Sequence, residues 1–346
     1  MKICFIVLAH HQPRIFHELI RNITWPNSDV VVHIDKRSDI NQFPISGFAN
    51  VRCMQNRRRV HWSGWSLTKT ICAALEYALQ VSDADYFLYM SGTDFPIQRA
   101  DVITEFLKKH YPTNFLNYYP LVPGIWGIGL IDRYWLNDLK ASLININPKD
   151  AAGRGEHWDE ALQYRTYPNV SYMRRMLGNF STKALRKLND RFFIPRNTTW
   201  TNFYCGSAKW CLNRETVRFV VDYYHARESR NLRNYLRLCA NSDEIFFQTS
   251  ILNSKHKEQC LGFDEVEAKE IFENKRPPMP DEKRVNLTYV DWSEEREDPA
   301  ILVESDFQRL KDSGNFFAMK FTDDKSFQLV KRIERELLGG GDAERC

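Results

Sequence analysis

The sequence lacks a hydrophobic run long enough to cross a membrane. Its first apolar run covers residues 3–8, whereas a spanning helix needs about 20 apolar residues. The run also lacks the longer apolar region and small-residue cleavage site of a signal peptide. We therefore expect a first β-strand here, no transmembrane segment and a cytoplasmic protein, and we leave peripheral association with a membrane open.

A strong net charge is absent as well. The 346 residues carry a formal charge of +4, with 27% charged and 43% hydrophobic residues, which is typical of a soluble globular protein. So small a charge gives no case for nucleic acid as a partner. Any attraction for anions should be local, as in a phosphate site.

Paired cysteine motifs are missing too. The eight cysteines, at positions 4, 53, 72, 205, 211, 239, 260 and 346, form no CxxC motif. We expect reduced thiols rather than a disulfide framework. His10 and His11 are adjacent on an extended segment, where neighbouring side chains point to opposite faces. We therefore expect one to be buried, neither to bind zinc, and no metal site at all.

Apolar runs and helical patterns alternate in the first hundred residues. The expected strands cover residues 3–8, 30–34 and 86–90, and the expected helices cover 13–23 and 66–80. Alternation of this kind favours a parallel sheet whose functional loops follow the carboxyl ends of its strands. Polar clusters follow these strands at residues 9–11, 35–36 and 91–94. We expect them to share one rim.

The rest of the chain predicts a second ordered block. Residues 114–202 have poor periodicity and resemble long loops around short helices. After them we expect a strand at 207–212, helices at 214–224 and 243–252, a last strand at 286–292 and a helix at 325–338. Ser242 is a candidate N-cap. We expect one domain over residues 1–335, with a nucleotide-binding half (1–110), an acceptor and catalytic half (111–335), and a tail (336–346).

Two adjacent acids, Asp243 and Glu244, stand at the edge of an apolar segment. Partial desolvation tunes the basicity of a carboxylate in such a place, so it can accept a proton from a sugar hydroxyl. The commoner meaning of such a pair is simply two acids favoured by the dipole at a helix N-terminus. Both interpretations stay open from the residues alone.

Seven short motifs carry a family resemblance. The three main ones are Gly92-Thr93-Asp94-Phe95-Pro96, Asp243-Glu244-Ile245-Phe246-Phe247 and Phe317-Ala318-Met319-Lys320-Phe321. The four shorter ones are Ile6-Val7-Leu8-Ala9-His10, Val32-His33-Ile34-Asp35, Trp62-Ser63-Gly64-Trp65-Ser66 and Gly206-Ser207-Ala208. In this order they resemble the core-2/I-branching glycosyltransferase family, which also contains the peptide xylosyltransferases. The similarity runs over residues 2–335, and the chain looks like an anchorless, bacterial-type member.

The resemblance implies an α/β fold of the GT-A type, with a mostly parallel central sheet flanked by helices. It also implies an inverting, metal-independent enzyme with a UDP-sugar donor and no cofactor. Glu244 then matches the catalytic base and Lys320 a basic residue on the diphosphate. Donor contacts are further expected at Ala9, Asp35 and Trp62, which match uridine-binding positions, and at Asp94, at the turn beneath the donor sugar.

We expect positively charged side chains, rather than a metal ion, to bind the diphosphate. The only Asp-x-Asp match of interest, Asp83-Ala84-Asp85, precedes the strand that it would have to follow in a metal-dependent GT-A enzyme. Without a metal, Lys or Arg must stabilise the leaving group. Lys320 fits, although a lysine at a strand edge often only extends its charge into solvent.

Three further residues are weaker candidates. Arg296 lies about one position from the place where the family has a second diphosphate-binding arginine. Arg133 and Trp292 are candidate acceptor contacts, because planar donors and aromatic faces suit sugars. Each is more often structural. The cluster Arg57-Arg58-Arg59 is either solvated or a phosphate contact.

The preferred interpretation is an inverting glycosyltransferase that moves a sugar from UDP to a carbohydrate hydroxyl and forms a β-linkage. N-acetylglucosamine is the first expectation for the donor sugar and xylose the second. One alternative is a glycoside hydrolase that uses Asp94 and Glu244 as a carboxylate pair, which requires a separation of roughly 5 to 9.5 Å. The other is a non-catalytic module that binds a nucleotide sugar.

Overall fold

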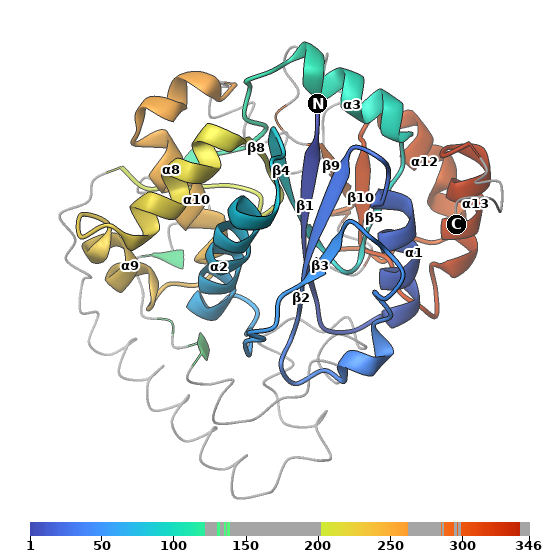
Figure 1. Ribbon diagram of the computed structural model, residues 1–346, viewed down its shortest axis with the longest axis horizontal. Helices are drawn as coiled ribbons and strands as arrows, with labels where there is room; N and C mark the ends of the chain where they lie inside the picture. Colours follow the sequence, from blue (N-terminus) through green and yellow to red (C-terminus); the bar gives the residue numbers. More distant parts are fainter. Residues whose placement is uncertain are drawn as a thin grey trace, which may run out of the picture.

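The central sheet accounts for most of the first hundred residues. The computed structural model describes residues 1–121, 130–131, 135, 137–138, 202–261, 285, 287–293, 296 and 299–339. Arg133 and most of the segment predicted as long loops lie outside these residues. The central sheet has the strand order β3-β2-β1-β4-β8 (Figure 1). Its strands are β1 (Ile3–Ala9), β2 (Ser28–Ile34), β3 (Val51–Cys53), β4 (Tyr86–Ser91) and β8 (Cys211–Asn213).

Four of these strands are parallel, and β8 runs antiparallel to β4 at one edge. Strand β1 is buried along its whole length. Ile3, Phe5 and Val7 face one hydrophobic cluster, and the alternate residues Cys4, Ile6 and Leu8 face another. A strand covered on both faces has a continuous apolar run instead of an alternating one, which is the pattern of residues 3–8.

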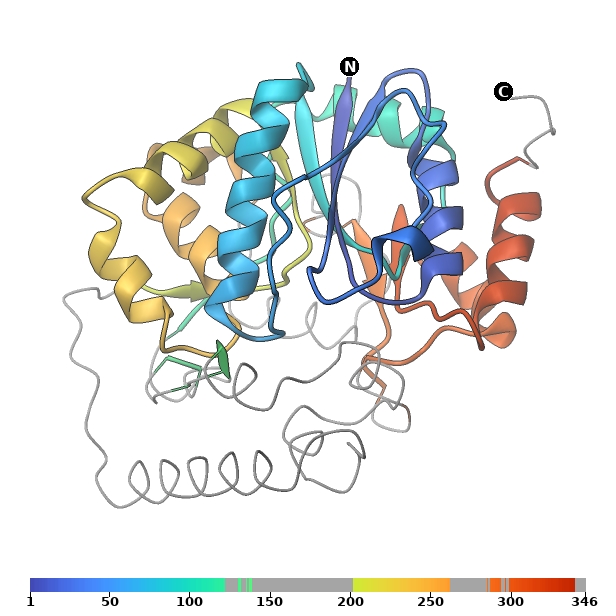
Figure 2. The same cartoon turned by 60° about the horizontal axis from the view of Figure 1, so that its bottom comes forward.

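Helices cover both faces of the sheet (Figure 1). One face packs against α1 (Pro13–Ile23), α3 (Ala100–Lys109), α12 (Phe307–Asp312) and α13 (Phe327–Glu336). The other packs against α2 (Trp65–Val81), α8 (Arg214–His225), α9 (Arg230–Leu236) and α10 (Asp243–Leu252). Figure 2 shows α1 and α2 on opposite sides of the strands. The predicted α/β class with a mostly parallel sheet is confirmed.

A second, smaller sheet continues from the carboxyl end of β4. It consists of β5 (Asp94–Pro96), β10 (Phe317–Met319) and β9 (Thr288–Val290), with β10 in the middle. Strand β10 is antiparallel to β5 and parallel to β9, and Met319 pairs with Asp94. This pairing brings Lys320, the next residue, to the turn that follows β4.

The shorter elements complete this part of the chain. Strands β6 (Tyr119–Pro120) and β7 (Tyr204–Cys205) form an antiparallel pair. The 3-10 helices are η1 (Ile40–Gln42), η3 (Lys255–Gln259) and η5 (Glu304–Asp306). Among the described residues, no helix has the length and apolar character needed to cross a bilayer.

The N-terminus of α1 is capped from the other end of the chain. The Asp323 carboxylate accepts hydrogen bonds from the backbone N–H groups of Ile15 (2.8 Å) and Arg14 (3.3 Å). In return, the Asp323 N–H donates to the Gln12 side chain at 2.7 Å. The first N–H groups of a helix have no partner inside it. This cap therefore satisfies them and ties the β1–α1 turn to the segment after β10.

Helices were predicted closely, and some strand details were wrong. The predicted bounds 13–23 and 243–252 are those of α1 and α10, whereas the strand predicted at 207–212 begins only at Cys211. Side chains occupy its first residues instead: the Ser207 hydroxyl accepts from the Lys209 N–H at 3.0 Å, and the Ser207 carbonyl accepts from Gln248 at 2.8 Å. Such local bonds compete with a strand ladder.

Two further predictions need correction. Ser242 does not cap α10 with its side chain. Its hydroxyl lies 2.7 Å from the Thr68 hydroxyl and 3.3 Å from the Gly64 carbonyl oxygen, so it joins α10 to α2. The strand predicted as the last one corresponds to β9, and β10 follows it in the chain.

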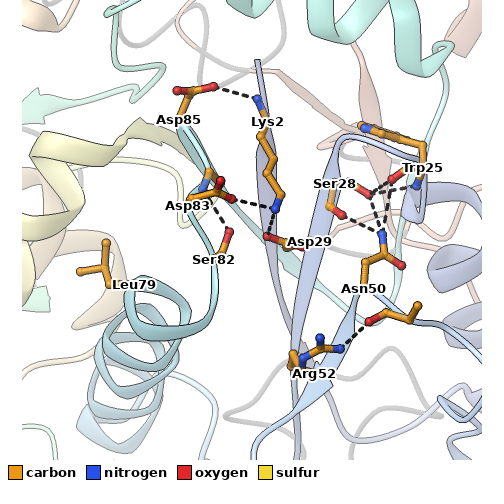
Figure 3. A network of polar contacts seen from close by, with 12 residues as sticks. Lys2, Trp25, Ser28, Asp29, Asn50, Arg52, Leu79, Ser82, Asp83 and Asp85 are labelled. Atoms are coloured by element: carbon orange, nitrogen blue, oxygen red, sulfur yellow. Dashed lines mark hydrogen bonds and ion pairs between the residues drawn. The ribbon is translucent and has the colours of Figure 1, made fainter.

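The Asp-x-Asp match lies at the opposite edge of the sheet from the polar loops. The Lys2 ammonium contacts Asp83 at 2.7 Å and Asp29 at 2.9 Å, and the Lys2 N–H donates to Asp85 at 2.8 Å (Figure 3). These residues precede β1, β2 and β4 or begin them, so the cluster lies at the amino ends of these parallel strands. Asp83 and Asp29 balance the charge of Lys2 there, and Asp85 accepts the Lys2 backbone N–H, so both acids of the motif are engaged away from the candidate site.

Candidate active site

The polar clusters after β1, β2 and β4 meet at one rim. The Asp35 N–H donates to the Ala9 carbonyl at 2.9 Å, and the Gly92 N–H donates to the Leu8 carbonyl at 2.9 Å. A Cβ atom on Gly92 would lie 2.6 Å from the Cβ of Ala9. Only glycine allows this approach. The tight packing therefore holds the turn after β4 directly against the end of β1.

Asp94 is a buried, fully engaged carboxylate in this turn. It accepts hydrogen bonds from the Ser91 N–H at 2.9 Å and from the Ser91 hydroxyl. The Lys209 ammonium lies 2.6 Å from Oδ2, the oxygen that also accepts the Ser91 N–H, and only 1% of Asp94 and 7% of Lys209 are exposed. Lys209 is not among the site residues expected from the sequence. Its one signal is a lysine within the mostly apolar segment 208–212.

Lys320 lies at the same rim as Asp94 and His10. The Phe321 N–H donates to the Thr93 carbonyl at 2.9 Å, which holds the end of β10 against the turn after β4. The positive charge of Lys320 acts on both His10 and His11. Lys320 therefore lies near the loop after β1.

Both histidines of that loop are neutral at pH 7. Burial, with a smaller effect of nearby positive charges, lowers the pKa of His10 to about 4 and that of His11 well below its usual value. His11 is buried, as predicted for one of the pair. The two rings do not point to opposite faces, because their centroids lie 4.0 Å apart at an angle of 33°. No metal-binding cluster of three or more His, Cys, Asp or Glu side chains occurs in the described part of the chain.

The N-terminus of α10 presents the two candidate acids. Asp243 is buried and Glu244 is partly exposed. Just before them, Asn241 has a left-handed backbone, and its N–H donates to the Ser63 carbonyl (3.1 Å) and hydroxyl (3.0 Å). Ser63 is left-handed too. The motif at residues 62–66 thus anchors the acid-bearing end of α10 through its backbone.

The two acids hold protons more tightly than ordinary carboxyl groups. Burial raises the pKa of Asp243 to about 6, although the Lys209 charge opposes the shift. Burial and the negative charge of Asp243 raise the pKa of Glu244 to about 8, and a 3.0 Å hydrogen bond from Asn241 opposes this. Neighbouring acids that interact this strongly titrate as a pair. Glu244 is the more basic of the two.

The predicted base and the predicted diphosphate residue belong to one continuous group. The Lys209 ammonium contacts Asp94 and acts electrostatically on Asp243, next to Glu244. On the other side, the Asp94 turn holds the end of β10 that carries Lys320. The structure therefore brings both residues to the same region of the rim.

Asp35 is engaged with its own loop. Its carboxylate accepts from the Arg37 guanidinium at 3.0 and 3.1 Å, from the Arg37 N–H at 2.8 Å and from the Val60 N–H at 2.8 Å. Burial raises the Asp35 pKa, but these bonds outweigh it, so the pKa lies below its usual value. Asp35 is thus ionised at neutral pH. Trp62, in the next loop, is 57% exposed.

Two of the arginines considered as ligand contacts, Arg57 and Arg296, bind other groups of the protein. Arg57 donates to the carbonyl oxygens of Ile34 (3.1 Å), Asp35 (2.7 Å) and Ser38, so its guanidinium closes the loop after β2. Arg296 lies 2.8 Å from both Asp291 and Asp306. Two carboxylates therefore balance its charge. Arg133 lies outside the described residues.

Of the aromatic candidates, Trp292 lies shortly after the end of β9 and is 38% exposed.

The seven cysteines within the described ranges are all free thiols, as expected, and Cys346 is outside those ranges. The sequence motifs thus located the loops of the rim well. They did not reveal which charged side chains the fold pairs with each other.

Residues 3–122 match the family model "Core-2/I-Branching enzyme". This match confirms the family resemblance over the first third of the chain. With the mostly parallel sheet flanked by helices, it also confirms the GT-A-type fold class. Glu244 and Lys320 lie beyond the matched residues, so their roles depend on the geometry of the rim.

Several curated proteins share part of this sequence. A xylosyltransferase of Ciona intestinalis is 28% identical over 127 residues, which is 34% of this chain and 14% of that protein. Xylosyltransferase 1 of Homo sapiens is 27% identical over 123 residues, 34% of this chain and 13% of that protein. Xylosyltransferase oxt of Drosophila melanogaster is 26% identical over 122 residues, with coverage of 34% and 14%. The matched part of the chain thus covers about a seventh of the length of these relatives.

Proposed function

We propose that this chain, which carries a Core-2/I-branching enzyme match over residues 3–122, is an inverting glycosyltransferase that uses a UDP-sugar donor. The observation that carries the proposal is the arrangement at the rim. An unusually basic carboxylate, Glu244, stands at the start of a buried helix, and Lys320 lies at the same rim, directly after β10. A base and a cation at one site are what transfer from a nucleoside diphosphate requires.

The reaction is a single displacement. The acceptor hydroxyl oxygen forms a bond to the anomeric carbon while the bond from that carbon to the diphosphate oxygen breaks. The hydroxyl proton goes to Glu244, and UDP leaves with the electron pair of the broken bond. Attack opposite the leaving group inverts the anomeric centre, so an α-linked UDP-sugar gives a β-linkage.

The environment of Glu244 suits a proton acceptor. A pKa near the working pH combines a useful ionised fraction with enough basicity to take up a proton. Burial and the charge of Asp243 supply this basicity by raising the Glu244 pKa to about 8. A fully solvated glutamate would be a much weaker base. General bases of this kind contribute roughly 10²- to 10⁴-fold in rate.

The donor would lie along the carboxyl ends of the strands. Ala9, Asp35 and Trp62 surround the proposed uridine position, and Asp94 lies in the turn beneath the donor sugar. We assign the diphosphate to Lys320, since the Arg296 charge is already balanced by Asp291 and Asp306. The acceptor would approach from the side of Glu244, with Trp292 and Arg133 as candidate contacts. We propose that no metal takes part.

The donor sugar is the least determined element of the proposal. The family resemblance makes N-acetylglucosamine the first expectation, and the names of the matched relatives support xylose. UDP-N-acetylglucosamine and UDP-xylose should therefore be compared directly. The acceptor class is a carbohydrate hydroxyl.

The test is UDP release from a panel of UDP-sugars, with and without a carbohydrate acceptor mixture. We expect release with one donor to depend on acceptor, and Glu244→Gln to lower the rate by at least about 10²-fold. Glu258→Gln, which changes an exposed acid in η3, is the matched control and should keep full activity. Retained turnover in Glu244→Gln would refute the base assignment.

The two alternatives predict different results. A carboxylate-pair hydrolase needs Asp94 as a second free carboxyl group, but Asp94 is buried and bound by Ser91 and Lys209. A non-catalytic module would gain thermal stability from UDP-sugars without releasing UDP from any of them. Binding without release in the complete panel would therefore replace the enzyme by a binding protein.

A further inference from the structure

Three segments that are far apart in the sequence meet beside Glu244. The Asn137 side chain donates to the Ser63 carbonyl and hydroxyl, both at 3.0 Å. The same two oxygens of Ser63 accept the Asn241 N–H, at 3.1 and 3.0 Å. The Asn241 side chain in turn donates to Oε2 of Glu244 at 3.0 Å. A continuous path of hydrogen bonds thus leads from Asn137 to the proposed base.

Asn241 contacts Glu244 through both its backbone and its side chain. Its carbonyl accepts the Glu244 N–H at 2.9 Å, while its amide holds the carboxylate. The Asn241 backbone is left-handed, with φ 48°, a conformation that asparagine adopts more readily than most residues. Ser63 and Asn137, which hold this backbone, are both buried. The amide therefore approaches the base from a well-fixed position.

Several titratable side chains surround Glu244 and come from different elements. They are Asp243 on the same helix, Cys205 on β7, Tyr119 on β6, Lys209, which acts on Asp243, and Asp138, which accepts the Ser66 N–H at 2.9 Å. Burial raises the pKa of both Cys205 and Tyr119 far above the usual value, so both are neutral at pH 7. Burial and Asp243 raise the pKa of Glu244, and the hydrogen bond from Asn241 opposes them.

We propose that Asn241 is a positioning residue for the transfer reaction: its amide fixes the orientation of the Glu244 carboxylate by holding Oε2. Asn137 and Ser63 keep Asn241 in place. No residue that the structure describes donates to Oε1, so we assign Oε1 to the proton of the acceptor hydroxyl. The inference deepens the proposed transferase function and rests on it.

Loss of the amide should disturb the base in two ways. A reacting group that is slightly misplaced loses rate even when its chemistry is unchanged. A hydrogen bond to an ionised carboxylate also favours that form over the protonated one. Without the Asn241 amide, Glu244 should therefore be less well oriented and should ionise only at higher pH.

Asn241→Gly separates the amide from the backbone. Glycine adopts the left-handed conformation without strain, so this variant can keep the backbone bonds to Ser63 and loses the side-chain bond to Glu244. We expect kcat at pH 7 to fall about tenfold and the pH midpoint of UDP release to rise by about one unit. The donor KM should change less than about twofold, because the amide contacts the base and not a proposed donor residue.

Two further variants complete this test. Asn231→Gly, at an exposed position of α9, is the matched control and should keep the wild-type kcat and midpoint. Asn241→Asp also suits a left-handed backbone, but its carboxylate cannot donate and adds a negative charge, so its midpoint should rise further than that of Asn241→Gly. If only the backbone of Asn241 matters, Asn241→Gly will behave like the wild type, which would overturn the proposal. An unchanged midpoint in Asn241→Asp would overturn it as well, even if Asn241→Gly does not fold.

Asn137→Ala tests the distant end of the path. It removes the donor of both bonds to Ser63, so Asn241 loses support and kcat should fall, but less than in Asn241→Gly. Once the Asn241 amide is absent, Asn137 has no contact with the base to support. The double variant should therefore be about as slow as Asn241→Gly alone. Losses that multiply in the double variant would refute the part assigned to Asn137.

Failure of the proposed function has its own signature. If the wild-type protein releases UDP from no donor, the transferase proposal fails, and the contact is then tested without turnover. Carbon NMR of the glutamate carboxyl groups measures the pKa of Glu244, whose signal is identified by its absence in Glu244→Gln. We expect this pKa to be about one unit higher in Asn241→Gly than in the wild type. Equal pKa values would refute the role of Asn241.

Discussion

Two neighbouring carboxyl groups, Asp243 and Glu244, show how burial creates a base. Desolvation disfavours the charged form of each, and each ionised neighbour disfavours it further. The result is a glutamate with a pKa of about 8 beside an aspartate with a pKa of about 6. Such shifted values concentrate at functional sites. The same environment reduces the stability of the folded protein once the acids ionise.

Glu244 should therefore give the enzyme an alkaline pH dependence. Only the ionised form accepts a proton, so kcat/KM should rise about tenfold per pH unit below a midpoint near 8 and then level off. The measurement is a pH series of UDP release with the preferred donor. A profile that is flat between pH 6 and 9 would contradict the role of Glu244.

The same group makes folding stability depend on pH. The folded protein keeps a proton on Glu244 up to about pH 8, whereas the unfolded chain releases it near 4.5. The folded state therefore binds more protons in this window, and stability falls as pH rises through it. Glu244→Gln removes this titration, so its melting temperature should fall less between pH 5 and 8 than that of the wild type. Glu258→Gln should follow the wild type.

Among the elements, those with a local cause were predictable. Helix α1 has Pro13 at its start and a regular apolar pattern, and β1 is an uninterrupted apolar run. Both are local signals. The partners of Lys209 and Arg296 were not predictable, because a lysine or arginine has many potential partners and the tertiary fold selects one. The side-chain bonds of Ser207 that replace a predicted strand have the same origin.

Substitutions at Asp323 test how the cap on α1 joins the two ends of the chain. Asp323→Ala removes the acceptor of two α1 N–H groups and should cost about 1 kcal/mol of stability, within the usual range of roughly 0.5–2. Asp323→Asn keeps an acceptor and should cost less. Asp324→Ala, at an exposed neighbouring position, is the matched control. Chemical denaturation measures all three, and equal stability of the Asp323→Ala and Asp324→Ala variants would refute the cap.

At the scale of the whole molecule, the rim depends on elements from both ends of the chain. The first strands supply Ala9, Asp35 and the Asp94 turn, while β10 brings Lys320 to that turn from the C-terminal part. The helix that carries Glu244 is anchored on residues 62–66 at the start of α2. No single segment contains the site. Donor binding should therefore stabilise the fold as a whole.

Thermal unfolding with UDP tests this assembly and the role of Lys320 together. A ligand at 100 times its dissociation constant stabilises the folded state by about 2.7 kcal/mol, so UDP should raise the wild-type melting temperature by several degrees. Lys320→Met should lose most of this rise, because the diphosphate loses a charge-assisted contact. Lys311→Met, at an exposed position of α12, should keep this rise.

EDTA should leave the UDP-induced rise in melting temperature unchanged in the wild type, since side chains rather than a metal are proposed to hold the diphosphate. A rise that disappears with EDTA and returns with a divalent cation would show that a metal holds the diphosphate. An equal rise in both lysine variants would remove Lys320 from the donor site.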